Sequence, residues 1–256
     1  MQAAVESGDA EELAELMRQD PGFDVNQDQD GDERTLLHQA CEEDSRSAVI
    51  PLLLAHPDID VNAKEDRYGW TPFFSACQFG SLSCVREMLK DSRVDLNEPD
   101  QYGRTALLAA VIHRHLCTIQ WWIASGREMN LGEPGDVDNT DAIGAAKEEG
   151  QTEMVTLLER FQSDAAKTRH AVRVELGLLN ELAAEMFALV VFVSDGLLQI
   201  KETTTPSPAA RFIKIARRLP LELQMVLCFL QVGSTKEIIS GKDSEVAFKE
   251  LARRLW

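Results

Sequence analysis

Apolar residues along this chain recur at the three- and four-residue spacing of helices that bury one side. In residues 1–161 short apolar stretches alternate with polar loops, and Val85, Met88 and Leu89 form one such apolar stripe. Each pair of stretches predicts two short helices joined by a tight turn, followed by a loop that leads to the next pair. The pattern therefore predicts an all-α fold.

The predicted helix pairs repeat with a nearly constant period. Four threonines mark the repeat starts: Thr35, Thr71, Thr105 and Thr140. They are 36, 34 and 35 residues apart, and an alanine follows each start by five residues: Ala40, Ala76, Ala110 and Ala145. An asparagine after an apolar residue recurs at a second fixed phase: Asn26, Asn62, Asn97 and Asn130. Such a period predicts a solenoid, in which each unit buries its apolar side against its neighbours.

The second repeat carries the clearest local signals. Thr71 is placed to cap the first helix, and Pro72 follows at its first position. Proline loses no hydrogen bond there, because the first amides of a helix have no intrahelical partner. Gly80 marks the turn between the two helices.

These segments resemble ankyrin repeats, which have a period of about 33 residues and a T-P-L-H-x-A core. The best copies are GWTPFFSACQFGSLSCVREMLKDSRVDLN and GRTALLAAVIHRHLCTIQWWI. Only His38 retains the histidine of the motif, and in the fourth copy Asp141 and Gly144 replace the usual proline and histidine. The resemblance covers residues 1–161 and implies an ankyrin-repeat solenoid.

We expect four ankyrin repeats in residues 28–161. Residues 1–27 contain one more helix pair without the threonine signature. Because the ends of a solenoid must be capped, we interpret residues 1–27 as the second half of a degenerate N-terminal capping repeat.

The resemblance also implies where a partner would bind. Ankyrin repeats present a concave surface, lined by the loops between helix pairs and by the outer positions of the first helices. Aromatic and arginine side chains dominate the energetics of protein interfaces. The predicted partner-binding residues are Arg67, Tyr68, Trp70, Phe79, Tyr102, Arg104, Ile112 and His113.

Residues 162–256 predict a C-terminal helical domain. Apolar residues at helical spacing indicate a long helix over 165–201, bent near 194–196, and the segment before Pro208 is a linker. Three shorter helices are expected over 208–218, 220–232 and 244–255. The segments RLPLELQMVLC and KDSEVAFKELA are similar to the tails of fungal ankyrin-repeat proteins, a resemblance that implies no activity.

A second interpretation of this domain starts from one motif. The motif Leu-Pro-Leu-Glu-Leu at 219–223 resembles the opening L-P-x-E-L-x-x-x-L of an F-box, and poxvirus ankyrin proteins carry such a motif at their C-terminus. The resemblance implies docking on a cullin-ligase adaptor, with these docking residues: Leu219, Pro220, Glu222 and Leu223. The same residues are also a good helix start, so a helical extension that covers the end of the solenoid is the competing interpretation.

The formal net charge of −17 is concentrated in the repeats. Residues 1–161 carry 32 acidic and 13 basic side chains, whereas residues 162–256 carry 11 and 13. Such a charge repels nucleic acid and anionic membranes and favours a basic protein or peptide as the partner. Plain solubility is the other explanation of the charge.

The sequence offers no constellation for catalysis, metal or cofactor binding. It contains no G-x-x-x-x-G-K-[ST] and no G-x-S-x-G, and His113 and His115 point apart on a helix. Five cysteines without paired spacing do not indicate disulfides, no secretory leader is visible, and the longest apolar run, 186–193, is too short to cross a membrane.

The sequence thus predicts an interaction module rather than an enzyme. We expect a monomeric protein of the cytoplasm, with the nucleus left open, that binds a basic protein or peptide on its concave surface. The adaptor of a ubiquitin ligase is the alternative.

Overall fold

The computed structural model describes residues 1–28, 31–132, 141–199, 208–233, 239 and 241–255. All regular secondary structure within these ranges is helical, which agrees with the predicted all-α class. The chain divides into two compact units, Met1–Arg169 and His170–Trp256, and the two are described separately here.

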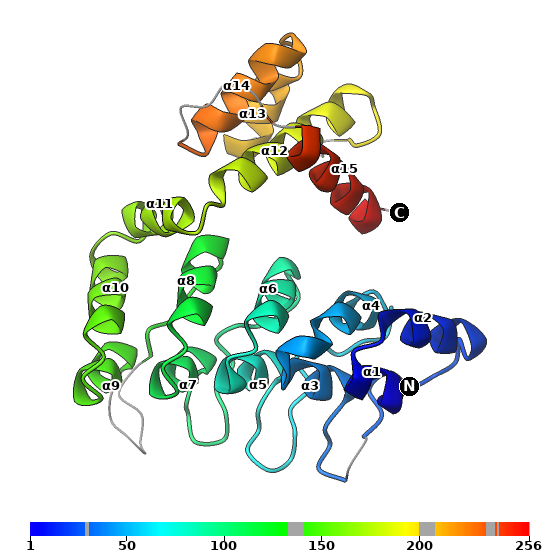
Figure 1. Cartoon of the computed structure of the whole chain (residues 1–256), viewed down its shortest axis with the longest axis vertical. Helices are drawn as coiled ribbons and strands as arrows, with labels where there is room; N and C mark the ends of the chain where they lie inside the picture. Colours follow the sequence, from blue (N-terminus) through cyan, green and yellow to red (C-terminus); the bar gives the residue numbers. More distant parts are fainter. Residues whose placement is uncertain (29–30, 133–140, 200–207, 234–238, 240, 256) are drawn as a thin grey trace. The chain divides into compact units, whose positions relative to one another are not determined.

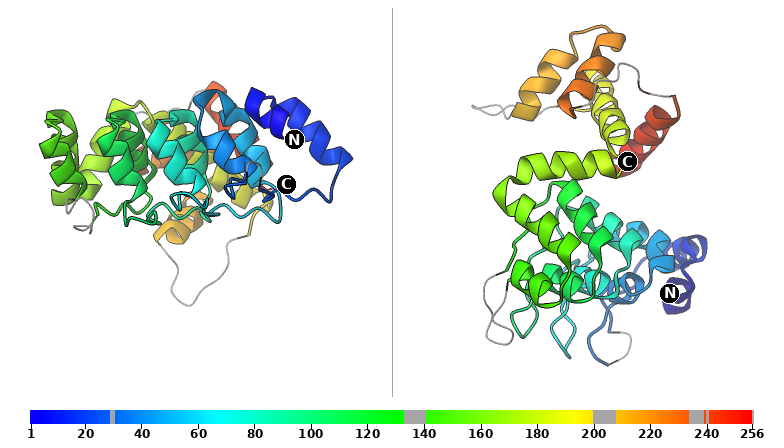
Figure 2. Two further views of the ribbon diagram at one scale, coloured as in Figure 1. Left: turned by 90° about the horizontal axis from the view of Figure 1, so that it is seen from below. Right: turned by 60° about the vertical axis from the view of Figure 1, so that its left-hand side comes forward.

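The first unit is a solenoid of helix pairs stacked in chain order (Figures 1 and 2). Its described part contains five pairs, each an antiparallel hairpin. They are α1 (Gln2–Ser7) with α2 (Ala10–Gln19), α3 (Leu36–Cys41) with η1 (Asp44–Val49) and α4 (Ile50–Leu54), α5 (Pro72–Phe79) with α6 (Leu82–Lys90), α7 (Ala106–Ile112) with α8 (Leu116–Ser125), and α9 (Ala142–Glu148) with α10 (Thr152–Ser163). Extended loops connect the pairs and project together from one side of the stack (Figure 1).

The N-terminal pair corrects our interpretation of residues 1–27 as the second half of a repeat. Both helices are present, and the turn between them has Gly8 at φ +71° and an Asp9 N–H that donates to Ala4 O at 2.9 Å. Ser81 N–H donates to Ala76 O in the same way, at 3.0 Å, in the second repeat. Residues 1–27 therefore contain a complete helix hairpin whose first helix is short.

The same turn bond corrects the start of the fourth repeat. His115 N–H donates to Ala110 O at 2.8 Å, and Gln151 N–H donates to Ala146 O, not to Ala145 O, at 2.9 Å. The N-cap is accordingly Asp141, whose carboxylate accepts from Gly144 N–H at 2.5 Å. Aspartate is a stronger N-cap than threonine, which explains the shift by one residue. Thr140, the predicted start, lies outside the described residues.

The second helix of the first repeat is divided into a 3₁₀ segment, η1, and the short helix α4. Ile50 N–H bonds to Ser47 O in the 3₁₀ pattern, and Pro51 follows in the first turn of α4. An α-helix continuing through this point would need the Pro51 nitrogen to donate to Ser47 O, and proline has no N–H.

The core of the solenoid is formed by side chains that interlock between neighbouring repeats. Met88, Trp122 and Leu158 occupy equivalent positions of the second helices and are fully buried. Phe73 packs edge-to-face on Trp122, with the ring centroids 5.1 Å apart. Aromatic side chains of this size contribute a large share of the buried apolar area, so each repeat depends on its neighbours for stability.

The phase-locked asparagines connect consecutive loops. Asn62 donates from Nδ2 to Arg93 O at 2.9 Å and accepts from Asp95 N–H at 2.8 Å. Asn26 makes the equivalent bonds one repeat earlier, and Asn97 accepts from Asn130 N–H at 2.8 Å one repeat later. A carboxamide suits this position because it offers a donor and an acceptor at once.

The second unit is a helical bundle around α12 (Leu179–Ser194). It also contains α13 (Pro208–Ala216), α14 (Leu221–Gln231) and α15 (Gly241–Leu255), and α11 (Ala165–Glu175) leads into it from the first unit. Small and aromatic residues of α12 form the centre of the core, with Phe187 packing edge-to-face on Phe248 of α15 at 6.2 Å.

The predicted long helix over 165–201 is wrong, because α11 and α12 are separate helices. Gly177 has φ +71°, and Leu178 N–H turns back to donate to Arg173 O at 2.9 Å. Glycine adopts this left-handed conformation without the strain that a side chain would bring, so it ends α11 although the apolar spacing continues. The predicted bend near 194–196 coincides with the end of α12. Residues 200–207, which include the linker, lie outside the described residues.

The remaining helices of the second unit lie close to their predicted bounds. The segments predicted over 208–218, 220–232 and 244–255 correspond to α13, α14 and α15. Pro220 is the N-cap of α14 rather than its first residue, and α15 begins at Gly241, three residues earlier than predicted.

Candidate functional site

The loop over 55–71 presents three of the predicted residues around one buried carboxylate. Glu65 accepts from the N–H groups of Arg67 and Tyr68 at 2.8 and 2.7 Å, and from Trp70 N–H at 3.2 Å. Hydrogen bonds from several backbone amides compensate a buried carboxylate for the loss of water. Glu65 thus determines the shape of the loop that carries Arg67, Tyr68 and Trp70.

The loop over 91–105 uses Asp100 in the same way. Its carboxylate is buried and accepts from Tyr102 N–H and Arg104 N–H, both at 2.9 Å, and from Arg104 Nε at 2.8 Å. The Arg104 guanidinium is therefore engaged within its own loop. Our sequence reasoning missed Glu65 and Asp100, although each precedes a Tyr-Gly pair at the tip of its loop, which is a usable signal.

An aromatic cluster connects the loop over 55–71 to α5. The Trp70 ring stacks between Tyr68 and Phe74, with centroid distances of 4.9 and 5.3 Å, and Phe79 meets it edge-on at 6.3 Å. Phe74 is fully buried and was not among the predicted residues. The Trp70 ring is half-buried by these neighbours. Its indole therefore supports the cluster, while Phe79 forms the exposed edge.

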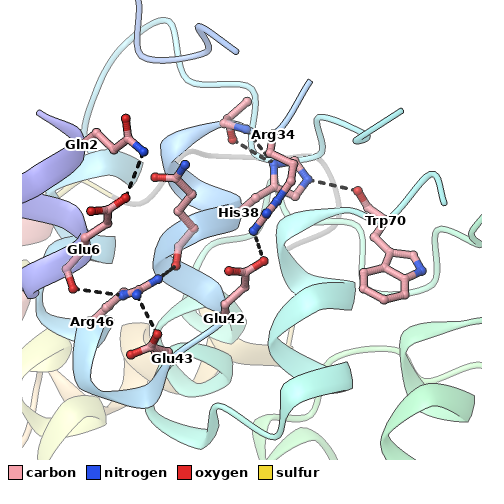
Figure 3. Close-up of polar contacts among 10 residues, drawn as sticks. Gln2, Glu6, Arg34, His38, Glu42, Glu43, Arg46 and Trp70 are labelled. Atoms are coloured by element: carbon pink, nitrogen blue, oxygen red, sulfur yellow. Dashed lines mark hydrogen bonds and ion pairs between the residues drawn. The ribbon is translucent and has the colours of Figure 1, made fainter. Parts of the chain in front are cut away.

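His38 holds the backbone of this loop from the preceding repeat (Figure 3). Thr35 N–H donates to Nδ1 at 3.2 Å, so the proton is on Nε2, which donates to Trp70 O at 3.0 Å. Burial is the main cause that lowers the pKa of His38 below its ordinary 6.5. A neutral imidazole therefore links the first repeat to the loop of the second.

Three of the predicted residues stand out by their exposure. Phe79 at the end of α5 is 50% exposed, Tyr102 in the loop over 91–105 is 44% exposed, and Ile112 at the end of α7 is 38% exposed. Within the described part of the first unit these are the exposed large hydrophobic residues. All three were predicted from the sequence, and exposed apolar groups of this kind mark interaction surfaces when they come together.

His113 extends this surface from the end of α7. It is exposed, and Gln78 Nε2 donates to its Nε2 at 2.6 Å. Partial burial, followed by the neighbouring His115 and Arg104, lowers the pKa of His113 below 6.5. Its neutral form is therefore the one that accepts from Gln78.

The two arginines predicted to bind a partner lie on aromatic rings of their own loops. The Arg67 guanidinium is 5.1 Å from the Tyr68 ring centroid, and the Arg104 guanidinium is 5.1 Å from that of Tyr102. Arg67 is exposed, whereas Arg104 is half-buried and paired with Asp100. Of the two guanidinium groups, only that of Arg67 has no ion pair with a carboxylate among the described residues.

In the first and fourth repeats, acidic residues occupy the position that Phe79 and His113 have in the second and third. In the corrected repeat register, Phe79 and His113 correspond to Glu43 in the first repeat and Glu149 in the fourth. Glu43 pairs with Arg46 at 2.6 Å, as Figure 3 shows, and Glu149 pairs with Arg114 at 3.2 Å. At the loop tips the Asp66 carboxylate raises the pKa of Glu33, the sign of two negative charges held close together.

The residues predicted to dock on an adaptor lie in the second unit. Leu219 is half-buried, and its carbonyl accepts from the buried Gln224 side chain at 2.9 Å. Pro220 and Glu222 are exposed, and Leu223 is 49% exposed. The motif thus begins α14 and leaves Leu223 open to solvent.

The described residues contain no group of three or more His, Cys, Asp or Glu side chains placed to hold a metal ion.

No single described helix is long and apolar enough to cross a membrane; α11 and α12 reach the necessary length and apolar composition only together, as a sharply bent pair.

The stacked helix hairpins, the projecting loops and the threonine-capped first helices define an α-helical repeat solenoid, a class of fold that serves as a protein-interaction module and is typically not catalytic. Sequence matches to ankyrin repeats, described as three copies, cover residues 1–100 and 56–133. Together they extend over more than half of the chain, which belongs to the ankyrin-repeat family.

One curated relative is named as an enzyme. The chain is 30% identical over 93 residues to the serine/threonine-protein kinase TNNI3K of the mouse, Mus musculus. The aligned region is 34% of this chain and 11% of the kinase. The chain thus spans about a tenth of that kinase, and the kinase activity is not assigned to this chain.

Proposed function

We propose that this protein binds a partner protein or peptide through an anchor surface formed by Phe79, Tyr102 and Ile112. The observation that carries the proposal is their exposure in a unit whose other large apolar residues are covered wherever the structure describes them. The three come from two successive repeats. A partner would bury them, and side chains of this kind supply most of the affinity of a protein interface.

The charge of the repeats supports a basic partner. The carboxylates of Glu43 and Glu149 flank the anchor surface, and residues 1–161 carry a net charge of −19. A field of this sign accelerates association with a positively charged partner. The proposed ligand therefore has an apolar anchor with lysine or arginine on both sides of it.

The proposal includes the setting in which the protein works. All five cysteines are free thiols, and burial raises the pKa of Cys84 to about 12. Four of the thiols are buried and that of Cys117 is exposed; free thiols of both kinds are compatible with a reducing compartment. We therefore propose that the protein works in the cytoplasm or the nucleus, as a monomer without catalytic activity of its own.

The experiment identifies the partner first and then tests the surface. Affinity purification with mass spectrometry on the full chain supplies a client, and calorimetry measures its affinity for Phe79→Ala, Tyr102→Ala and Ile112→Ala. We expect each substitution to weaken binding about tenfold, because each removes an anchor that the partner buries. Stability should change less than binding, since the three side chains are partly exposed, and Phe79→Ala should cost the most because Phe79 packs against Trp70.

Leu197→Ala is the matched control, since Leu197 is equally exposed but lies in the second unit. A client that binds all three anchor variants as tightly as the wild type would refute the proposed surface. If the client is acidic and these variants no longer bind it, the proposed surface would stand and the proposed basic character of the partner would be refuted.

A second candidate function is the ligase adaptor, and the exposure of Leu223 at the start of α14 favours it. An F-box-like segment would dock on a cullin adaptor through this side chain together with Pro220 and Glu222. Purified cullin adaptor should then bind the wild type and lose affinity for Leu223→Asp while tolerating Phe79→Ala. Absence of binding by the wild type would exclude this function.

A further inference from the structure

The helix α14 presents an apolar stripe to solvent. Leu223, Val226, Leu227 and Leu230 follow the spacing i, i+3, i+4 and i+7, which places them along one side of the helix. Leu223 and Leu230 are 49% and 61% exposed at the two ends, and the two residues between them are half-buried. The opposite side of α14, which includes Cys228 and Phe229, is buried in the core of the bundle. Leu227 also packs against that core, so Leu223 and Leu230 are the stripe residues that the packing of this unit leaves exposed.

Three arginines without an ion pair among the described residues precede α14 in the sequence. Arg211, Arg217 and Arg218 are exposed, and the described residues supply no ion pair to any of them. Arg211, the exposed Ile215 and Arg218 are spaced by four and three residues, so they share one side of α13 and its extension. Within 208–233 the chain has four basic residues and one acidic residue, Glu222.

Several arginines of the repeats are bonded instead. Arg34, Arg46 and Arg104 each pair with a carboxylate, and Arg127 donates to backbone carbonyls of the preceding repeat at 2.6 and 2.7 Å. The guanidinium groups of these four arginines thus stabilise the fold through ion pairs or hydrogen bonds. Arg211, Arg217 and Arg218 have no such bond within the part of the chain that the structure describes.

We propose that the stripe and its arginines form a docking surface for an acidic amphipathic helix of a partner protein. The leucine spacing matches the helix-in-groove mode, in which anchors at i, i+3, i+4 and i+7 meet across two helices. The unpaired guanidiniums would bond glutamates or aspartates that flank the partner's apolar side. This surface is independent of the anchor surface on the repeats and takes a ligand of the opposite charge.

Two other occupants fit the charges less well. A second copy of this chain would bring together two molecules of net charge −17, with local arginines facing arginines. An anionic membrane would meet the basic stripe favourably but would repel the acidic repeats of the same molecule. A separate acidic helix satisfies the local surface without either repulsion.

The test uses the full chain and a labelled amphipathic peptide that carries leucines at i, i+3, i+4 and i+7 with glutamates on both flanks. The matched control peptide has lysines in place of the glutamates. We expect fluorescence anisotropy to show binding of the acidic peptide and at least about tenfold weaker binding of the lysine peptide. Leu230→Asp should lower the affinity for the acidic peptide about tenfold, and Arg217→Glu with Arg218→Glu should reverse the preference between the peptides.

Leu230 and the two arginines lie outside the predicted adaptor-docking residues, and their exposure makes misfolding an improbable cause of any loss; thermal unfolding of each variant checks this. Equal binding of both peptides, or unchanged binding to Leu230→Asp, would overturn the proposal. So would a dimer of the wild type that Leu230→Asp dissolves in light scattering, which would assign the stripe to a second copy. Binding to phosphatidylserine vesicles lost with the arginine variant would assign it to a membrane.

Discussion

At the scale of single residues, buried polar side chains decide the shape of the proposed binding surface. His38, Glu65 and Asp100 are buried. Each forms hydrogen bonds with backbone groups of a loop that carries a predicted binding residue. A buried polar group left without its partner costs about 1–3 kcal/mol. Loss of any one of these three side chains should therefore change the conformation of the loop it bonds.

The stability of the repeats should depend on pH through His38. Its folded pKa is lowered, so below 6.5 the unfolded chain binds the proton more readily than the folded one. The stabilisation is present above the unfolded pKa of 6.5 and is lost as the pH falls toward the lower folded value. We expect urea unfolding of wild type to give a free energy that declines across this window, and His38→Gln to show a smaller decline from a starting stability about 1–2 kcal/mol lower. Equal slopes for the two proteins would rule out His38 as the source.

At the scale of elements, the turn between the paired helices determines the register of each repeat. The turn residue has positive φ in the second, third and fourth repeats, at Gly80, Arg114 and Gly150. The arginine shows that the bond to the repeat alanine is strong enough to impose a left-handed conformation on a residue with a side chain. Glycine avoids a cost of about 1–2 kcal/mol at such a position.

Gly80 has a second constraint beyond its φ of +68°. A Cβ added there would lie 2.3 Å from Nδ1 of His115, whose other nitrogen bonds to Gln78 O at 3.2 Å. Gly80→Ala should therefore lower the free energy of unfolding by more than Gly103→Ala, because Gly103 has a similar φ of +78° and open space around it. Chemical denaturation of both variants measures the difference, which we expect to exceed about 1 kcal/mol. Equal losses would show that His115 moves aside at no cost.

At the scale of the whole molecule, the two units differ in charge and in the partner they suit. Under our two proposals, the anchor surface of the acidic repeats would bind a basic ligand, and the apolar stripe of the helical unit with its arginines would bind an acidic one. A chain with two such surfaces would connect two proteins of opposite charge, which is the role of a scaffold.

This charge separation predicts the effect of salt. Raising the ionic strength from physiological to about 1 M shortens the Debye length from about 8 to 3 Å. Association of a basic client with the repeats should then slow at least about tenfold in stopped-flow measurements. Phe79→Ala should show the same dependence on salt from a lower affinity, because it removes apolar area and no charge. An association rate that is insensitive to salt would refute electrostatic steering.

The fold was largely predictable from the sequence because its signals are local. A capping threonine, an alanine five residues later and a spacing of 34 to 36 residues each act through bonds within one hairpin or between adjacent repeats. The same locality explains the errors. Asp141 competed with Thr140 for the cap, and Gly177 ended a helix within a continuous apolar pattern; a single backbone conformation decided each case.

By itself the sequence determined the repeat, the helix hairpins and the residue types on the loops. Only the tertiary structure decided which of those residues are available. Phe79, Tyr102 and Ile112 are exposed, while Trp70 is covered by Tyr68 and Phe74, and Arg104 is held by Asp100. The physical reason is that helix periodicity and caps depend on a few neighbouring residues, whereas exposure and pairing of a side chain depend on what adjacent repeats and loops place against it.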